Sequence, residues 1–131
     1  MKQNREKQQA GVWIDNTKAV IITHTPENEA GAYSIKEKIK ASEAHAGGSE
    51  HSMNNARQTD LLKYYKSLSS RLVAYDELLV FGPGMSQEQF GNHLEGNAQF
   101  KGTKVTINST EQLTDPQMIA KVRDFFEAHQ S

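Results

Sequence analysis

The sequence predicts a single α/β domain built on a mixed five-stranded sheet with helices on its faces. Two observations predict this class. Three strand-like stretches open the chain, and helix-like and strand-like stretches then alternate to its end. The 131 residues, 36% of them apolar and 24% charged, suffice for one globular domain. A domain of this size buries about two-thirds of the surface that its unfolded chain exposes.

The first two expected strands form a hairpin. Gly11–Asp15 is a short apolar run, and the residues DNT at 15–17 that follow it favour a tight turn. Lys18–His24 then supplies the β-branched residues typical of a second strand.

A third strand is expected over residues 33–40, where the side chains alternate between two faces. One face carries Tyr33, Ile35, Glu37 and Ile39. The other carries Ser34, Lys36, Lys38 and Lys40. This period of two predicts a strand with one solvent-exposed face. Residues 41–53 lack an apolar period, so we expect a mobile loop there.

From about Asn54 the spacing of apolar residues changes to three and four. These residues are Leu61, Leu62, Tyr65, Leu68, Leu72 and Val73. The pattern predicts an amphipathic helix of about five turns that buries this face and ends near Tyr75.

The second half of the chain predicts two further strands. Glu77–Gly82 is an almost continuous apolar run, as expected for a central strand buried on both sides. Gly82, Pro83 and Gly84 then break the chain, and Lys104–Ile107 reads as the last strand.

Two capping patterns predict where the last two helices begin. Ser86 precedes a short helix over Gln87–Leu94 and has Gln89 three residues on, the spacing of a capping box. Thr114 has Gln117 at the same spacing. The final helix has an apolar stripe of Ile119, Val122, Phe125 and Phe126.

The element order is therefore βββαβαβα, which is the order of the ribonuclease H-like architecture. Strands joined in parallel through a helix require right-handed crossovers. Without an internal repeat or a domain boundary, we expect one domain over residues 11–131. A flexible polar tail is expected to precede it at residues 1–10.

Asp15 stands where ribonuclease H-like nucleases place a metal-binding carboxylate. Such nucleases need further carboxylates to hold two magnesium ions, and the end of the fourth strand, FGPG, has none. We therefore interpret Asp15 as a turn residue that accepts hydrogen bonds from its own backbone.

Charge and composition narrow the possible functions. The formal net charge of −1 argues against a generally basic nucleic-acid binder. Between Ala32 and Leu72, however, seven basic and four acidic residues give a local charge of +3, which fits either an anionic partner or a solvated face. The chain has no cysteine, and its histidines lack metal-ligand spacing, so we expect neither a metal nor a cofactor. With no secretory signal and no membrane-spanning apolar run, a cytoplasmic protein is expected.

The segment HAGGSEHSMNNAR, residues 45–57, carries a resemblance to a known family. The motif residues, followed by two tyrosines in the next helix, are Gly47, Gly48, Ser49, His51, Arg57, Tyr64 and Tyr65. Downstream, LLVFGPGMSQEQFGNHL combines an apolar strand, a small-residue turn and a short helix. Over most of its length the chain resembles the middle, Gly-Gly-Gln-bearing domain of eukaryotic and archaeal class-1 peptide chain release factors. Related stand-alone bacterial and archaeal release-factor-like proteins share this pattern.

The resemblance implies a protein linked to translation or ribosome rescue. In the family, the loop enters the peptidyl-transferase centre, where its glutamine helps water to attack the peptidyl-tRNA ester. Ser49 stands in the place of that glutamine and has a shorter side chain without an amide. We therefore expect a non-hydrolytic module that binds the ribosome, or ribosomal or transfer RNA. The expected contact residues are Gly47, Gly48, Ser49, His51, Arg57, Lys63 and Lys66.

Alternatives remain open for each of these features. The protein could instead be a peptidyl-tRNA hydrolase in which Ser49 or the loop backbone positions water, or a protein-interaction domain that has lost any translational role. The glycine loop is equally explained as a mobile connector, and Lys63 and Lys66 as solvated helix charges. Gly82 and Gly84 fit either an anion site, formed with the following helix N-terminus, or a tight structural turn.

Overall fold

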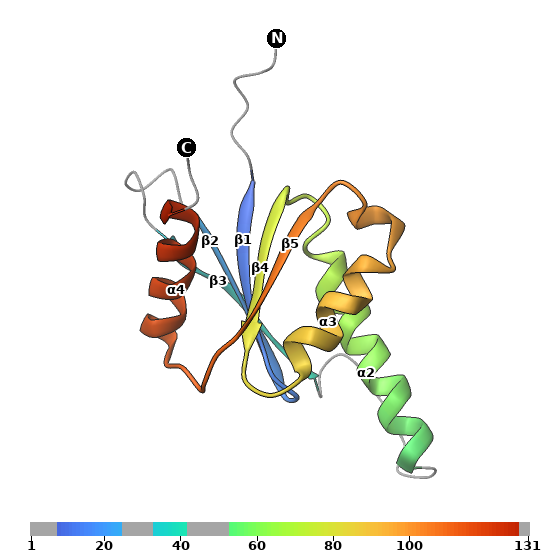
Figure 1. The fold of residues 1–131 in the computed structure, drawn as a ribbon. Coiled ribbons are helices and arrows are strands. Elements are labelled where there is room, and N and C mark those ends of the chain that lie inside the picture. The colour runs from blue at the N-terminus through green and yellow to red at the C-terminus, as the bar shows by residue number, and fades with distance from the viewer. Residues whose placement is uncertain (1–7, 25–32, 42–52, 129–131) are drawn as a thin grey trace.

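The structure of the protein, a computed structural model, describes residues 8–24, 33–41 and 53–128, with side chains described from residue 61 onward in the last range. Its elements are β1 (Gln9–Ile14), β2 (Lys18–His24), β3 (Tyr33–Lys40), α2 (Met53–Ser70), β4 (Glu77–Gly82), α3 (Ser86–Glu95), the short 3-10 helix η1 (Ala98–Phe100), β5 (Lys104–Ser109) and α4 (Asp115–Ala128) (Figure 1). This order confirms the predicted α/β class.

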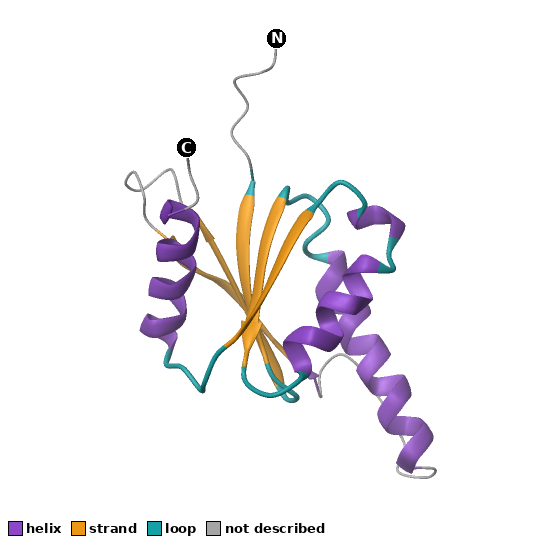
Figure 2. Ribbon diagram, viewed as in Figure 1, coloured by secondary structure: helices purple, strands orange, loops and turns teal. Residues whose placement is uncertain are grey.

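One mixed sheet of five strands organises the described part of the chain, in the order β3-β2-β1-β4-β5 (Figure 2). β2 is antiparallel to β1 and β3, whereas β4 is parallel to β1 and β5. At the centre, Val12 of β1 pairs with Ile21 of β2 and with Val80 of β4. Every residue of β4 after Glu77 is buried, which confirms the predicted central strand.

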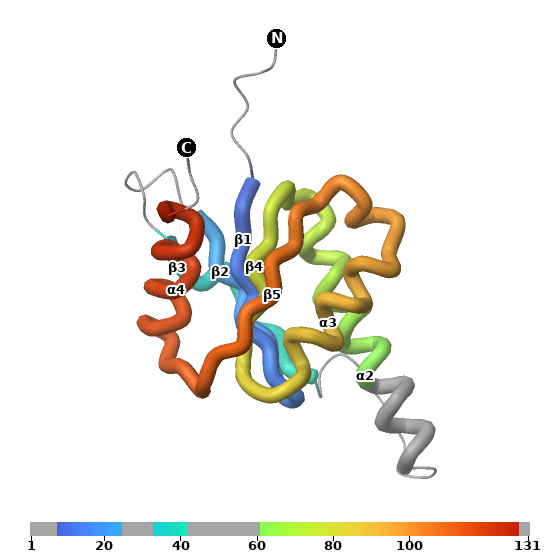
Figure 3. Tube along the Cα trace, in the orientation of Figure 1, coloured from blue at the N-terminus to red at the C-terminus, as the bar shows by residue number. Residues whose placement is uncertain are grey.

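Helices cover both faces of the sheet, with α2 and α3 on one face and α4 on the other (Figures 1 and 3). Because side chains alternate along a strand, Val12 and Ile14 of β1 face α2 and α3 while Trp13 faces α4. The two faces thus have separate cores. Helix side chains complete them, namely Tyr64, Leu68, Phe90 and Leu94 on one face and Met118, Val122 and Phe126 on the other.

The first strand begins two residues earlier than the sequence predicted, at Gln9. Ala10 is fully buried and pairs with Thr23 of β2 and Leu78 of β4, so the end of the expected tail at 1–10 belongs to β1. The Gln8 backbone N–H donates to Asp76 Oδ2 at 2.8 Å, which fixes the start of the strand. Two glutamines before Ala10 concealed this start. The rest of the expected tail, residues 1–7, lies outside the described residues.

The two capping predictions have opposite outcomes. At the start of α4, the Thr114 N–H donates to Gln117 Oε1 at 2.9 Å and the Gln117 N–H donates to Thr114 Oγ1 at 3.3 Å, so the capping box is confirmed. At α3 the prediction is wrong. Ser86 is already inside the helix, and its hydroxyl donates to Asn16 Oδ1 at 2.7 Å in the β1–β2 turn.

α2 buries a face that differs in part from the predicted one. Leu68 and Leu72 are buried as expected, but Leu62 is 52% exposed and Val73 39% exposed. Tyr64 is fully buried in place of Leu62. The buried stripe runs at helical spacing through Leu61, Tyr64 and Leu68, so Leu62 lies beside it.

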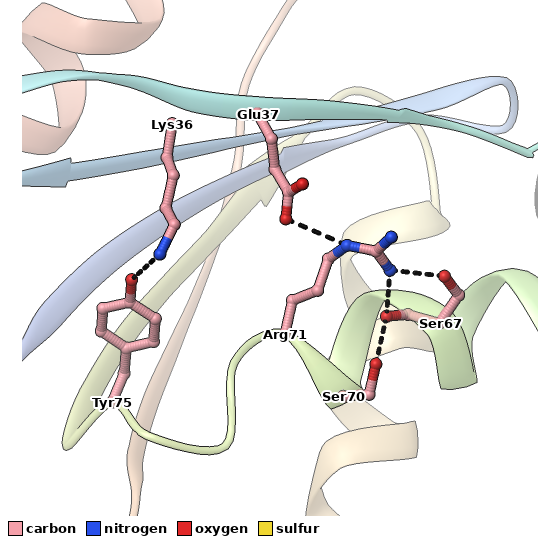
Figure 4. A network of polar contacts seen from close by, with 6 residues as sticks. All are labelled: Lys36, Glu37, Ser67, Ser70, Arg71 and Tyr75. Carbon is pink, nitrogen blue, oxygen red and sulfur yellow. Dashed lines mark hydrogen bonds and ion pairs between the residues drawn. The ribbon is translucent and has the colours of Figure 1, made fainter.

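A β-bulge in β3 overturns the predicted alternation of this strand. Ile21 of β2 pairs with Glu37 and Ile22 pairs with Ile35, so Lys36 is an extra residue. As Figure 4 shows, Lys36 and Glu37 consequently point the same way, toward the C-terminal end of α2. There Lys36 Nζ lies 3.5 Å from the Tyr75 hydroxyl, and the Arg71 guanidinium lies 3.0 Å from Glu37 Oε2.

Candidate functional site at the carboxyl edge of the sheet

The segment that carries the glycine motif starts from the edge of the sheet at which the parallel strands end. We call this the carboxyl edge; β1, β4 and β5 end there, β2 begins there and β3 leaves there at Lys40. The Ala41 N–H donates to the Thr17 carbonyl at 2.8 Å, which fixes the point where the segment departs. The chain is described again from Met53, the first residue of α2.

Several expected contact residues lie outside the described part of the chain. They are Gly47, Gly48, Ser49 and His51, and with them lie residues 42–52 of the mobile loop predicted at 41–53. Arg57 lies within α2, but its side chain is not described. Their role in binding therefore stays a prediction, and the described flanks of the segment define the candidate site.

The β1–β2 turn is held by Asp15, as the sequence predicted. Asp15 Oδ1 accepts hydrogen bonds from the Thr17 N–H at 2.8 Å, the Thr17 hydroxyl at 2.9 Å and the Lys18 N–H at 2.9 Å. The Asp15 N–H donates in turn to the Lys18 carbonyl at 3.0 Å. This carboxylate is thus engaged by its own turn, and the turn interpretation is confirmed.

Tyr64 links α2 to this turn. Its ring is fully buried, and its hydroxyl donates to the Asp15 carbonyl at 3.2 Å. Burial, with smaller effects of the Asp15 and Tyr65 charges, raises the pKa of Tyr64 well above its ordinary value, so the phenol stays protonated and can only act as a donor to this carbonyl. The helix that follows the glycine segment is thereby positioned against the carboxyl edge.

Gly82, Pro83 and Gly84 form a tight turn between β4 and α3. Gly82 has φ 158°, and a Cβ atom there would lie 2.2 Å from the Ile14 carbonyl oxygen. Gly84 adopts φ 69°, and its carbonyl accepts a hydrogen bond from the fully buried Gln87 amide at 2.9 Å. Backbone geometry alone requires both glycines, which favours the structural turn. The anion site at Gly82 and Gly84 stays a prediction.

Lys63 and Lys66 are both exposed on α2, three residues apart and therefore on one side of the helix. Behind them, the Tyr65 ring contacts the rings of Phe90 and His93 of α3, with centroids 5.5 Å and 5.7 Å away. Burial lowers the pKa of His93, and the charge of Lys66 lowers it further. The structure thus brings two of the expected basic contacts together at the described flank of the segment.

The described residues give no indication of a metal site or a membrane span. No group of three or more histidine, aspartate or glutamate side chains among them is placed to hold a metal ion. None of their helices combines the length and apolar character needed to cross a bilayer.

Comparison with known proteins identifies the fold. No protein-family model matches the chain, and no curated protein sequence matches it. Among solved structures, Archaeoglobus fulgidus Pelota is similar to 97% of the chain at 10% identity, with a TM-score of 0.61. The chain has the fold of a domain of Pelota. Thermoplasma acidophilum Pelota matches 98% of the chain at 14% identity and a TM-score of 0.55.

A third similar structure is Dom34 of S. cerevisiae, which matches 94% of the chain at 13% identity and a TM-score of 0.50. Dom34 is a translation termination-like factor involved in RNA quality control pathways and interacting with Hbs1. This chain covers 35% of each Pelota structure and 38% of Dom34, so it spans little more than a third of their length. The resemblance to release-factor-like proteins is confirmed at the level of the fold.

Proposed function

We propose that this chain is a translation-factor module that binds ribosomal or transfer RNA on the cytoplasmic ribosome without hydrolysing the peptidyl-tRNA ester. The segment at 45–57 and the basic side of α2 make the contacts. The observation that carries the proposal is the fold similarity to Pelota along 97% of the chain, combined with a Gly-Gly segment between β3 and α2. Translation termination-like factors such as Dom34 have this fold.

The framework around the segment supports a binding role. Glycines accept backbone angles that other residues avoid, so Gly47 and Gly48 allow close approach to an RNA backbone. The departure point at Ala41 and the position of α2 are both fixed by hydrogen bonds to the β1–β2 turn. Lysine side chains on α2 supply the sequence-independent attraction to phosphates.

The decisive experiment is sedimentation of the purified protein with ribosomes through sucrose gradients at low salt, where phosphate contacts are strongest. We expect co-sedimentation of the wild-type protein and weaker co-sedimentation of the double variant Lys63→Gln/Lys66→Gln. The matched control is Lys101→Gln/Lys104→Gln, which removes two exposed lysines near the opposite edge of the sheet. A wild-type protein that stays entirely in the free fraction contradicts the proposal.

A second assay separates binding from hydrolysis. Ser49 lacks the amide with which the family's glutamine helps to position water, so we expect no release of labelled peptide from stalled ribosomes above background. Release that Gly48→Ala abolishes would instead establish a peptidyl-tRNA hydrolase. Co-purification of a single protein partner without RNA would favour the protein-interaction alternative.

A further inference from the structure

Three lysines gather on the α4 face of the sheet at the carboxyl edge. Lys18 of β2 lies on this face, since its Nζ is 5.7 Å from the centre of the Trp13 ring in the α4-side core. Lys38 of β3 lies there too, because its Nζ forms a 2.7 Å ion pair with Asp115 at the start of α4. Lys40 follows two residues later on the same strand and faces the same way. We call Lys18, Lys38 and Lys40 the strand lysines.

The positions of the strand lysines are unfavourable for the stability of the fold. Lys18 and Lys40 are direct partners in the β2–β3 ladder, and such partners have Cβ atoms about 4.5–5.5 Å apart. Like charges directly opposite one another destabilise a sheet. Asp115 compensates Lys38, but within the described residues no carboxylate pairs with Lys18 or Lys40. Among the described residues, no carboxylate therefore neutralises these two adjacent positive charges.

Trp13 explains how one of these charges is held in place. The indole is fully buried, so it presents a fixed ring face to the Lys18 ammonium. A cation over an aromatic ring is attracted without losing its net charge. Lys18 is thus oriented at the surface but stays available to an anion.

We propose that the strand lysines bind the phosphate backbone of single-stranded RNA. The inference rests on the proposed function and extends it, because it assigns RNA contacts to the face opposite α2. The last of the strand lysines, Lys40, directly precedes Ala41, from which the glycine segment departs. A strand of RNA that reaches this segment from the α4 side would therefore pass over the lysines.

The chemistry of this face favours RNA over an acidic protein. The core of a protein–protein interface is usually apolar, and the large apolar side chains exposed in the described part of the chain are Leu62, Val73 and Met85. All three lie on or beside α2 and α3, away from the strand lysines. Lysines that lack a carboxylate partner among the described residues, as Lys18 and Lys40 do, and that surround no apolar centre are typical of phosphate-backbone contacts.

The test measures binding of a short single-stranded RNA of mixed sequence by fluorescence anisotropy, between about 50 and 200 mM salt. For Lys18→Gln/Lys40→Gln we expect affinity to fall on the order of tenfold at about 0.1 M salt, and the magnitude of the slope of log K against log salt to decrease by roughly 1.4. The control Lys101→Gln/Lys104→Gln should retain wild-type affinity. The Lys18/Lys40 variant should also unfold at an equal or higher urea concentration, since it removes a like-charge pair.

The outcomes distinguish this inference from the proposed function. If the wild-type protein binds RNA, and only Lys63→Gln/Lys66→Gln weakens binding, the inference is wrong and the proposed function stands. If the wild-type protein binds neither RNA nor ribosomes, both fail. Equal affinity and equal salt dependence for an oligoglutamate peptide would overturn the assignment to RNA.

Discussion

The turn between β4 and α3 needs glycine at two positions, Gly82 and Gly84, for different physical reasons. Replacing each glycine by alanine tests these reasons separately. At Gly82 an added Cβ would meet backbone atoms, with the Ile14 carbonyl oxygen 2.2 Å away and its carbonyl carbon 3.2 Å away. No side-chain rotation can relieve this contact, so β1 and β4 would have to move apart. At Gly84 the φ of 69° is unfavourable for other residues, but nothing lies within 4 Å of the added atom.

The expected costs follow from these geometries. For Gly82→Ala, overpacking costs about 1–3 kcal/mol and backbone strain about 1–3 kcal/mol more. A loss of about 2–6 kcal/mol is therefore expected, a large part of the 5–15 kcal/mol that is typical for a domain. For Gly84→Ala only the left-handed conformation is penalised, at about 1–2 kcal/mol.

Urea denaturation followed by circular dichroism measures both costs, provided that the two variants share the wild-type m value. The reasoning is refuted if Gly82→Ala loses no more stability than Gly84→Ala. RNA binding adds a second readout, because a Cβ at Gly84 would project into open space and could obstruct an anion that approaches the turn. If Gly84→Ala folds normally but loses RNA affinity, the turn is an anion site.

Two further predictions concern the core and pH. A Cβ at Gly11 would lie 2.2 Å from Val122 Cγ2, so Gly11→Ala should cost about 1–3 kcal/mol. Adding Val122→Ala should recover part of this loss in a double-mutant cycle, and purely additive costs would contradict the contact. Burial and then Lys66 lower the pKa of His93 below 6.5, so as pH falls through 6.5 the unfolded chain binds a proton that the folded protein does not. This contribution to stability should therefore be complete above this pH and decline below it. His93→Gln should make the urea midpoint depend less on pH between about pH 5 and 8, and an unchanged pH dependence would contradict this assignment.

Local sequence signals were sufficient for the parts of the fold that depend on neighbouring residues. The Asp15 turn and the Thr114–Gln117 capping box each involve groups within three positions of one another, and both were predicted correctly. The apolar run at 77–82 likewise predicted a central strand, because a strand buried on both sides needs no alternation.

Features that depend on distant contacts could not be predicted in this way. Ser86 had the spacing of an N-cap, but its hydroxyl bonds to Asn16, 70 residues away in sequence. The buried face of α2 was assigned only in part, since Leu62 is exposed and Tyr64 is buried. The alternation over residues 33–40 placed Lys38 and Lys40 on one exposed face, but no local signal indicated that Lys18 of the neighbouring strand lies on that face with them.

The bulge in β3 explains why the strand lysines share one face of the sheet. With strict alternation from Ile35, which packs on the α4-side core, Lys38 and Lys40 would face α2 and Ile39 would face α4. The extra residue at Lys36 reverses the rest of the strand, so that Ile39 is buried in the α2/α3 core and both lysines join Lys18 on the α4 face. Deleting Lys36 should therefore return Ile39 to the α4 side and separate the lysines from Lys18. The same bulge thus buries Ile39 in the α2/α3 core and brings the strand lysines together on the α4 face.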